Sequence, residues 1–223
     1  YNPIEEYLNS TGHWDGKDRI RALADLVPCN NPYWRELFYR WFLSMPAHWQ
    51  NIDRQHGNNT SPLLVGAQGY RKSTFCRILL PPELRCYFYT KTNSDRLNKD
   101  DLFSLTEFAL ICFEELDGMR PAELNQLKAM VTMPYVNERA AYGRNKERHP
   151  HIASLCGTGN NVQCLTDPTG NRRWLPVEVS QIRDPHQHAI PYELVYSQAY
   201  ALWKSGFCHW FSQEEIRKLN MHN

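Results

Sequence analysis

The sequence has no apolar stretch that could cross a membrane, because its longest apolar runs are segments such as ALICF at residues 109–113. No signal peptide is visible, and the chain begins at Tyr1 rather than at a methionine, so we expect a fragment of a longer protein. Internal repeats and low-complexity segments are also missing. A net charge of +1 gives no overall preference for an acidic partner, so any nucleic-acid surface has to be a local patch.

The seven cysteines never form a CxxC pair, and several lie inside apolar runs. This pattern favours buried free thiols in a reducing cytoplasm over a disulfide framework or a zinc site. Histidines cluster only in HPH at 149–151 and HQH at 186–188, and neither cluster has acidic or cysteine neighbours at ligand spacing. The sequence therefore disfavours a metal held by cysteine or histidine.

What is present is enough apolar material for a real core, because 42% of the 223 residues are hydrophobic. The first 56 residues are predicted to be helical, with helices over 2–11, 16–27 and 31–49. In the third of these, Asn31 is a candidate cap and Pro32 is expected at the first helical position. One face of that helix collects four aromatic side chains: Trp34, Phe38, Trp41 and Phe42. These rings could stack on bases, but packing in the core is the favoured interpretation.

From residue 60 onward, short apolar strands alternate with helices. Strands are predicted at 62–66, 86–90, 108–113, 152–158 and 174–179. Helices are predicted at 72–80, 96–105, 121–131, 192–206 and 212–220. Continuous apolar strands separated by helices indicate an α/β fold whose parallel sheet is covered on both sides. We expect a small helical subdomain over 1–56, a core over 57–190, and C-terminal helices over 191–223 packed on that core.

The segment LLVGAQGYRKSTF at residues 63–75 has the pattern of a phosphate-binding loop between a strand and a helix. Gly66 and Gly69 allow the turn, Lys72 neutralises phosphate oxygens at the helix start, and Ser73 offers a hydroxyl to Mg²⁺. The remaining loop residues expected to contact the nucleotide are Gln68, Tyr70, Arg71 and Thr74. Arg71 stands where the pattern G-x-x-x-x-G-K-[ST] has glycine, and it is acceptable there if its φ is negative. The alternative is a strand–loop–helix with a chance KST.

Acidic and amide side chains follow two other predicted strands. Glu114 and Glu115 end the strand at 108–113, and ligands bind where parallel strands end. We assign Glu114 to Mg²⁺ through water and Glu115 to the attacking water, while Asp117 has a capping role as its alternative. Asn160, after the strand at 152–158, is a candidate for contacting the γ-phosphate and the water, with an Asn-rich turn as the alternative.

Two arginines, Arg172 and Arg173, follow the Gly-Asn turn in DPTGNRRW. Because a guanidinium is rigid and always charged, it suits the charge that develops in phosphoryl transfer. A pair on a loop could reach the nucleotide of a neighbouring subunit. A solvated basic turn is the alternative.

Together these motifs resemble the virulence-associated protein E (VirE-like) family of mobile-element and phage proteins, related to superfamily 3 helicases among the AAA+ P-loop NTPases. Five segments of the sequence support this resemblance, and they occur in the order expected for the family: NPIEEYLNSTGHWDGKDRI, GAQGYRKST, EELDGM, GTGN and DPTGNRRWLPV. The order and rough spacing hold from residue 1 to about 215. The resemblance implies an ATP-dependent motor domain that uses Mg²⁺ and acts on DNA during replication or transfer, often beside a primase-polymerase. It also implies a ring, a hexamer by analogy alone.

Helicases of this kind resemble rings whose central hairpins touch single-stranded DNA. The matching stretch here is NERAAYGRNKERHPH at residues 137–151. Its candidate DNA contacts are Arg139, Tyr142, Arg144, Lys146 and Arg148. Cations neutralise phosphates and an aromatic ring stacks on a base, whereas the alternative is an exposed hairpin without a ligand.

The sequence therefore predicts a helicase-type ATPase. A nucleotide-binding switch or assembly module with little hydrolysis is the second hypothesis, and Arg71 favours it. A small-molecule kinase on the same loop is the third, and it requires an acceptor pocket and a lid.

Overall fold

The computed structural model describes residues 2–50, 60–92, 97–138, 147–161 and 173–220. Five parallel strands form the central sheet in the order β2-β3-β6-β1-β7. These strands are β1 (Ser61–Val65), β2 (Phe88–Lys91), β3 (Leu110–Phe113), β6 (Ser154–Gly159) and β7 (Trp174–Glu178). The parallel sheet predicted from the sequence is confirmed.

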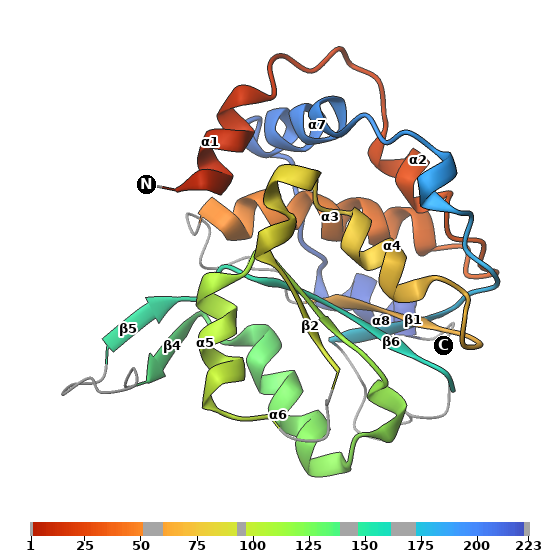
Figure 1. Ribbon diagram of the computed structural model, residues 1–223, viewed down its shortest axis with the longest axis vertical. Coiled ribbons are helices and arrows are strands. Elements are labelled where there is room, and N and C mark those ends of the chain that lie inside the picture. The colour runs from red at the N-terminus through yellow and green to blue at the C-terminus, as the bar shows by residue number, and fades with distance from the viewer. Residues whose placement is uncertain (1, 51–59, 93–96, 139–146, 162–172, 221–223) are drawn as a thin grey trace.

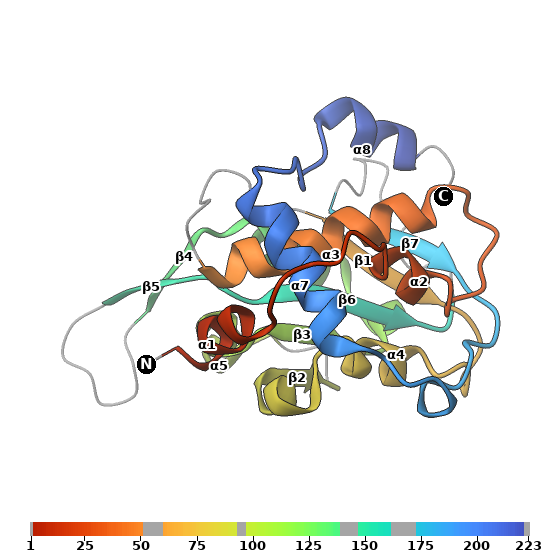
Figure 2. The ribbon, with the colours of Figure 1, turned by 90° about the horizontal axis from the view of Figure 1, so that it is seen from above.

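Helices cover both faces of this sheet (Figure 1). One face carries α1 (Pro3–Ser10), α2 (Ile20–Ala24), α3 (Trp34–Gln50), α4 (Lys72–Ile78) and α7 (Tyr192–Lys204). The other face carries α5 (Lys99–Glu107) and α6 (Pro121–Thr132). Helix α8 (Gln213–Asn220) lies outside α3 (Figure 2), where Arg40 of α3 forms an ion pair with Glu215 at 3.0 Å.

The strands are apolar throughout because successive side chains enter two different cores. On β1, Leu64 packs in the cluster formed with α3 and α4, whereas Leu63 and Val65 pack in the cluster formed with α5 and α6. On β3, Cys112 packs in the cluster with α3 and α4, and Phe113 packs in the cluster with α5 and α6. A strand buried on both faces needs apolar residues at every position, which removes the usual alternation.

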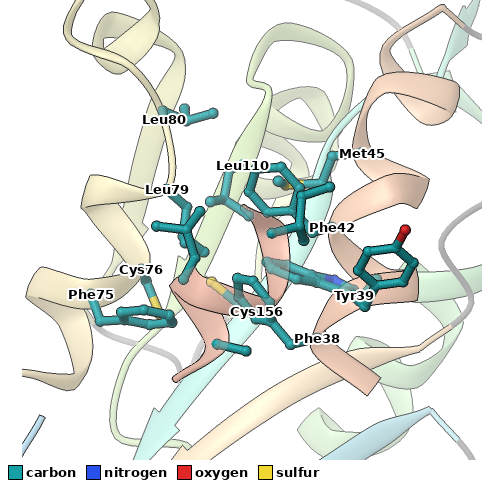
Figure 3. Packing of buried hydrophobic residues seen from close by; sticks show 14 of the residues in the cluster. Phe38, Tyr39, Phe42, Met45, Phe75, Cys76, Leu79, Leu80, Leu110 and Cys156 are labelled. Carbon is teal, nitrogen blue, oxygen red and sulfur yellow. The ribbon is translucent and has the colours of Figure 1, made fainter. Parts of the chain in front are cut away.

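The aromatic stripe of α3 is core, as the favoured interpretation predicted. Trp34, Phe38, Trp41 and Phe42 are each at most 3% exposed. The Phe38 ring lies 5.7 Å from the Phe42 ring and 5.8 Å from the Phe75 ring of α4, measured between centroids, so it joins the two helices (Figure 3).

Several element boundaries differ from the prediction. Helix α3 begins at Trp34, so Pro32 is not in its first position, and the Asn31 side chain accepts a hydrogen bond from the Tyr33 N–H at 2.9 Å. Residues Pro82–Tyr87 form a short 3-10 helix, η1, which delays the start of β2 to Phe88. The predicted helix over 16–27 shortens to α2.

The structure also contains a second, two-stranded sheet, whose strands were not predicted. It is an antiparallel hairpin of β4 (Tyr135–Glu138) and β5 (Glu147–Pro150), and it extends away from the central sheet (Figures 1 and 2). Its position in the chain is the stretch that the family resemblance identifies as a hairpin.

The N-terminal helices share one hydrophobic cluster with the sheet and with α7. The division at residues 56 and 190 therefore stays a prediction about sequence segments. None of the described helices is long and apolar enough to span a membrane.

The chain leaves β1 toward α4 on one face and leaves β3 toward α6 on the other (Figure 1). In open α/β sheets, a crevice forms at the carboxyl ends of the strands where consecutive connections go to opposite faces. The fold therefore opens a crevice next to the ends of β1, β6 and β3.

Replacing Phe38 by alanine should lower the free energy of unfolding by about 3–5 kcal/mol, because the fully buried ring leaves a cavity between α3 and α4. Leu194→Ala is the control, since Leu194 is 37% exposed on α7 and should change stability by less than about 1 kcal/mol. Urea denaturation of both variants measures the difference, and equal losses would contradict the packing described for Phe38.

Candidate functional site

A pocket of about 370 Å³ lies at the carboxyl ends of β1, β3 and β6. Its lining comes from the loop before α4 and its first turn, from the end of β3, and from the end of β6. The lining residues are Gln68, Gly69, Tyr70, Arg71, Lys72, Ser73, Thr74, Glu114, Glu115, Thr158, Gly159 and Asn160. Three predicted motifs, separated by up to about ninety residues along the chain, thus meet at one place.

The loop between β1 and α4 depends on two glycines for different reasons. A Cβ on Gly66 would lie 2.5 Å from the backbone oxygen of Val179, so this position requires the close approach that only glycine permits. Gly69 has φ +85°, a left-handed conformation that glycine adopts without strain. The Gly66 N–H also donates to the Gly159 carbonyl at 3.2 Å, which fixes the loop to the end of β6.

Lys72 begins α4, and its side chain is folded back over this loop. The Nζ atom donates to the carbonyl oxygens of Gly66 at 2.5 Å and Ala67 at 2.9 Å, and lies 3.5 Å from Oδ1 of Asn160. Lys72 is 8% exposed, and burial lowers its pKa below the usual value while the charge of Asp117 opposes this shift. The result is a shielded cation at a helix start, where an anion would be favoured.

Arg71 adopts φ 62° and ψ 25°, a left-handed conformation. The expectation from the sequence was that arginine is acceptable at this position if its φ is negative, and that condition is not met. Such a conformation costs a non-glycine residue about 1–3 kcal/mol and persists only where the surroundings enforce it. Here Nη1 of Arg71 donates to the Ile182 carbonyl at 3.3 Å, and Nη2 lies 3.8 Å from Asp184. The segment after β7 thus holds Arg71 in place.

The two predicted acids both line the pocket, and they differ in exposure. Glu114 is half-buried and follows β3 directly, with its N–H donating to the Lys91 carbonyl at 3.0 Å. Glu115 is exposed and has φ 55°, so the backbone turns sharply there into the 3-10 helix η2 (Leu116–Gly118). This turn presents successive carboxylates at the same wall of the pocket.

Asp117 does not cap the following helix, and that alternative is wrong. The N-terminus of helix α6 is instead capped by Glu123, whose carboxylate accepts a hydrogen bond from the Arg120 N–H at 2.9 Å. Asp117 Oδ1 accepts a hydrogen bond from the Asn160 N–H at 3.0 Å. This bond connects the segment that follows β3 with the end of β6. The sequence carries no signal for this contact, because the two residues are separated by 43 positions.

The strand β6 contributes Thr158, Gly159 and Asn160 to the pocket. Thr158 is 4% exposed, and it pairs in register with Leu64 of β1. Asn160 is exposed at the end of the strand, between Lys72 and Asp117. This position agrees with the predicted contact to a ligand's terminal phosphate, although the role itself stays a prediction.

Of the two predicted arginines, only Arg173 is among the described residues. Arg172 is outside the described residues, as are Arg139, Tyr142, Arg144 and Lys146 of the predicted DNA contacts. The Arg173 guanidinium donates to the Lys128 carbonyl of α6 at 2.7 Å and is not among the residues lining the pocket. Within this chain, Arg173 therefore does not contact the pocket.

Arg148 lies on the hairpin, exposed, with its guanidinium 3.5 Å from the centroid of the Tyr135 ring. This contact joins β5 to β4 and keeps the cation at the hairpin surface. Only residues 151–153 separate β5 from β6, and the N–H groups of Ile152 and Ala153 both donate to the Leu105 carbonyl, at 2.9 and 3.0 Å.

Three of the described cysteines are buried free thiols, as the sequence predicted. Cys76, Cys112 and Cys156 are at most 2% exposed, with their sulfur atoms within 4.8 Å of one another between α4 and the sheet. Burial raises the pKa of Cys156 well above its usual value, so this thiol keeps its proton. Cys86 and Cys208 are exposed instead.

Residues 8–223 match the family model described as the virulence-associated protein E-like domain. The chain belongs to this family.

Among solved structures, two apo structures of the NrS-1 C-terminal region, residues 305–718, resemble the fold. One has a TM-score of 0.53 at 13% identity, with coverage of 96% of this chain and 49% of that chain. The other has a TM-score of 0.54 at 12% identity, with coverage of 96% and 50%. This chain therefore spans about half the length of those structures, and the likeness concerns the fold alone. No curated protein matches the sequence.

Gly66→Ala should lower the free energy of unfolding by about 1–3 kcal/mol, because the new Cβ meets a backbone oxygen that cannot rotate away. Gly118→Ala is the matched control, since a Cβ there has nothing within 4 Å and φ is not positive. Thermal and urea unfolding of the two variants give the comparison. A Gly66 variant as stable as the Gly118 variant would rule out the tight approach to Val179.

Proposed function

We propose that this domain binds ATP with Mg²⁺ and hydrolyses it as a motor acting on DNA, in replication or transfer of a mobile element or phage. The observation that carries the proposal is the meeting of Lys72, Ser73, Glu114, Glu115 and Asn160 around one pocket. A cation and a helix start bind phosphate, while acids on the opposite wall serve metal and water. The fold proposed is that of a P-loop NTPase of the AAA+ and superfamily 3 helicase kind.

The residues of the pocket divide the work by their chemistry. Lys72 exchanges its loop carbonyls for phosphate oxygens, and the loop N–H groups surround the same phosphates. Ser73 and Glu114 line the pocket and would hold Mg²⁺, Ser73 through its hydroxyl and Glu114 through water, because Mg²⁺ prefers hard oxygen ligands. Bound Mg²⁺ would neutralise charge on the β- and γ-phosphates. Glu115 orients and activates the attacking water, and Asn160 donates its amide N–H to the γ-phosphate.

The nucleoside is proposed to occupy a neighbouring pocket of about 610 Å³, which shares Tyr70 and Asn160 with the phosphate pocket. Its wall includes Pro28, Val179 and the Tyr70 ring, and its polar side chains are Asn30, Asn160, Glu178 and Ser180. A wall that combines apolar and aromatic surface with a few convergent polar groups is typical of a site for an organic ring.

A neighbouring copy is proposed to supply the remaining cation. Arg71 is the one arginine among the described residues that lines the phosphate pocket. The Arg173 guanidinium is instead hydrogen-bonded to the Lys128 carbonyl. Arg172 or Arg173 of another subunit would stabilise the charge that develops on the phosphoryl group. This arrangement requires an oligomer, a hexamer by analogy, and makes turnover dependent on protein concentration.

The hairpin of β4 and β5 is proposed to contact single-stranded or duplex DNA. It extends from the body of the domain and carries Arg148 over Tyr135 at its base. A cation beside an aromatic ring suits a backbone phosphate and a stacked base.

A nucleotide-controlled switch is the second candidate, and the geometry of Arg71 favours it. The left-handed residue links the phosphate loop to Ile182 and Asp184. A nucleotide that rearranges the loop would therefore also displace the segment after β7, and binding without hydrolysis would be sufficient for this effect.

Lys72→Ala should weaken ATP binding roughly tenfold or more, because it removes a charge-assisted contact of about 1.5–3 kcal/mol. Glu115→Gln should bind ATP normally and lose about 10²–10⁴-fold in turnover. Lys204→Ala, an exposed lysine on α7, is the control. ATP affinity and turnover are measured separately over a protein dilution series, with and without single-stranded DNA. Tight binding without turnover in the assembled state would support the switch instead, and normal binding by Lys72→Ala would refute both.

Arg148→Ala should weaken single-stranded DNA binding uniformly across sequences and reduce the slope of log affinity against log salt by about 1. Arg217→Ala on α8 is the control, because it removes an exposed arginine far from the hairpin in sequence. Fluorescence anisotropy at several salt concentrations measures both quantities. An unchanged salt slope would remove Arg148 from the DNA contact.

A further inference from the structure

A third pocket, of about 560 Å³, lies directly beside the phosphate pocket and has no place in the proposed hydrolysis. It is formed by α4, η1, β2 and the segment after β7. The two pockets share Ser73, Thr74 and Glu114, so ligands in both would be neighbours. The wall away from this shared edge carries Arg77, Arg85 and His186.

Arg77 carries an uncompensated charge on this wall. It lies on α4 one helical turn after Ser73, it is exposed, and it forms no ion pair with any of the described residues. Side chains four positions apart lie on the same helix face, so Arg77 is directed to the side of α4 that carries the Ser73 hydroxyl.

Arg85 is held rigidly, but by neutral partners. Its Nε donates to the Leu80 carbonyl at 3.2 Å, and its Nη2 donates to the Tyr192 hydroxyl at 2.9 Å. The Tyr192 hydroxyl in turn donates to the Ile78 carbonyl at 2.7 Å. The guanidinium is therefore fixed in position while its charge is not matched by a carboxylate of the described residues. Fixing the donors in advance lowers the entropic cost of binding an anion.

We propose that this pocket is a second phosphate site, which holds the phosphate group of another ligand beside the nucleotide. Two arginines without carboxylate partners on a concave wall favour a dianion with several acceptor oxygens. Glu114 at the shared edge repels an anion, which places the phosphate toward Arg77 and Arg85. Phe88 and Ile78 complete the wall and would contact an organic group attached to that phosphate.

This composition differs from that of the pocket proposed for the nucleoside, which has no arginine or lysine in its lining. The ligand is therefore a phosphate dianion, either inorganic phosphate or the phosphate group of a phosphomonoester. The phosphate has two chemical sources, the γ-phosphate released from ATP and a separate phosphorylated molecule. The binding itself does not require the domain to hydrolyse ATP.

The test measures binding of inorganic phosphate and of a nucleoside monophosphate by calorimetry. In the Lys72→Ala variant, which weakens the first pocket, one phosphate should still bind per chain. Adding Arg77→Gln should weaken that binding roughly tenfold, the effect of one charge-assisted hydrogen bond. Arg77 has no described partner, so its substitution should not unfold the chain, and Arg217→Gln is the control. Loss of all binding in Lys72→Ala alone, or no effect of Arg77→Gln, would overturn the proposal.

A second measurement repeats the titration with a non-hydrolysable ATP analogue at saturation. Simultaneous binding of analogue and phosphate supports a separate site, whereas competition would mean that the nucleotide itself occupies the pocket and would overturn the proposal. Tighter binding of free phosphate identifies the released γ-phosphate as the source, and tighter binding of the monophosphate identifies a separate ligand. If the chain fails to bind the analogue but keeps the Arg77-dependent phosphate, the proposed ATPase fails and the second site stands.

Discussion

The register of β6 between β1 and β3 is the constraint on which the candidate site depends. Gly157 pairs with Leu63 on one side and with Phe113 on the other, so the three strands reach the same edge of the sheet together. A Cβ at Gly157 would lie 2.6 Å from Leu116 and 3.0 Å from Trp174. The central strand thus needs glycine at this point, because the side chains packed over it leave no room.

Hydrogen bonds extend this alignment into the loops beyond the strands. The Gly66 N–H donates to the Gly159 carbonyl, the Asn160 N–H donates to the Asp117 carboxylate, and the Lys72 ammonium donates to the Gly66 carbonyl. The first two bonds join the ends of different strands, the third closes the loop after β1, and each of the three has a main-chain group on at least one side. The pocket is therefore shaped before a ligand arrives, which lowers the cost of ordering it on binding.

Elements with a strong local pattern were predictable from the sequence. The apolar strands, the stripe containing Phe38 and the strand–loop–helix around Lys72 follow from periodicity and from glycine placement, and the family resemblance is confirmed by the match over residues 8–223. Because parallel strands end at a common edge, the meeting of Lys72 with Glu115 also follows once the strands are recognised.

The features that sequence reasoning missed all depend on contacts between distant segments. The positive φ of Arg71 is set by Ile182 and Asp184, more than a hundred positions away. Asp117 has an unremarkable local sequence, and only the fold shows that its partner is Asn160. The strand order and the hairpin contact of Arg148 with Tyr135 have the same origin in tertiary structure.

The short connection between β5 and β6 gives the hairpin and the pocket a common backbone. Asn160 ends β6 at the pocket, and Arg148 lies on β5 only six residues before β6 begins at Ser154. A strand rises by about 3.3 Å per residue, so the six residues of β6 span roughly 20 Å between the hairpin attachment and the pocket. A displacement of β6 along its axis would therefore move Asn160 and the base of the hairpin together, because only residues 151–153 separate β5 from β6.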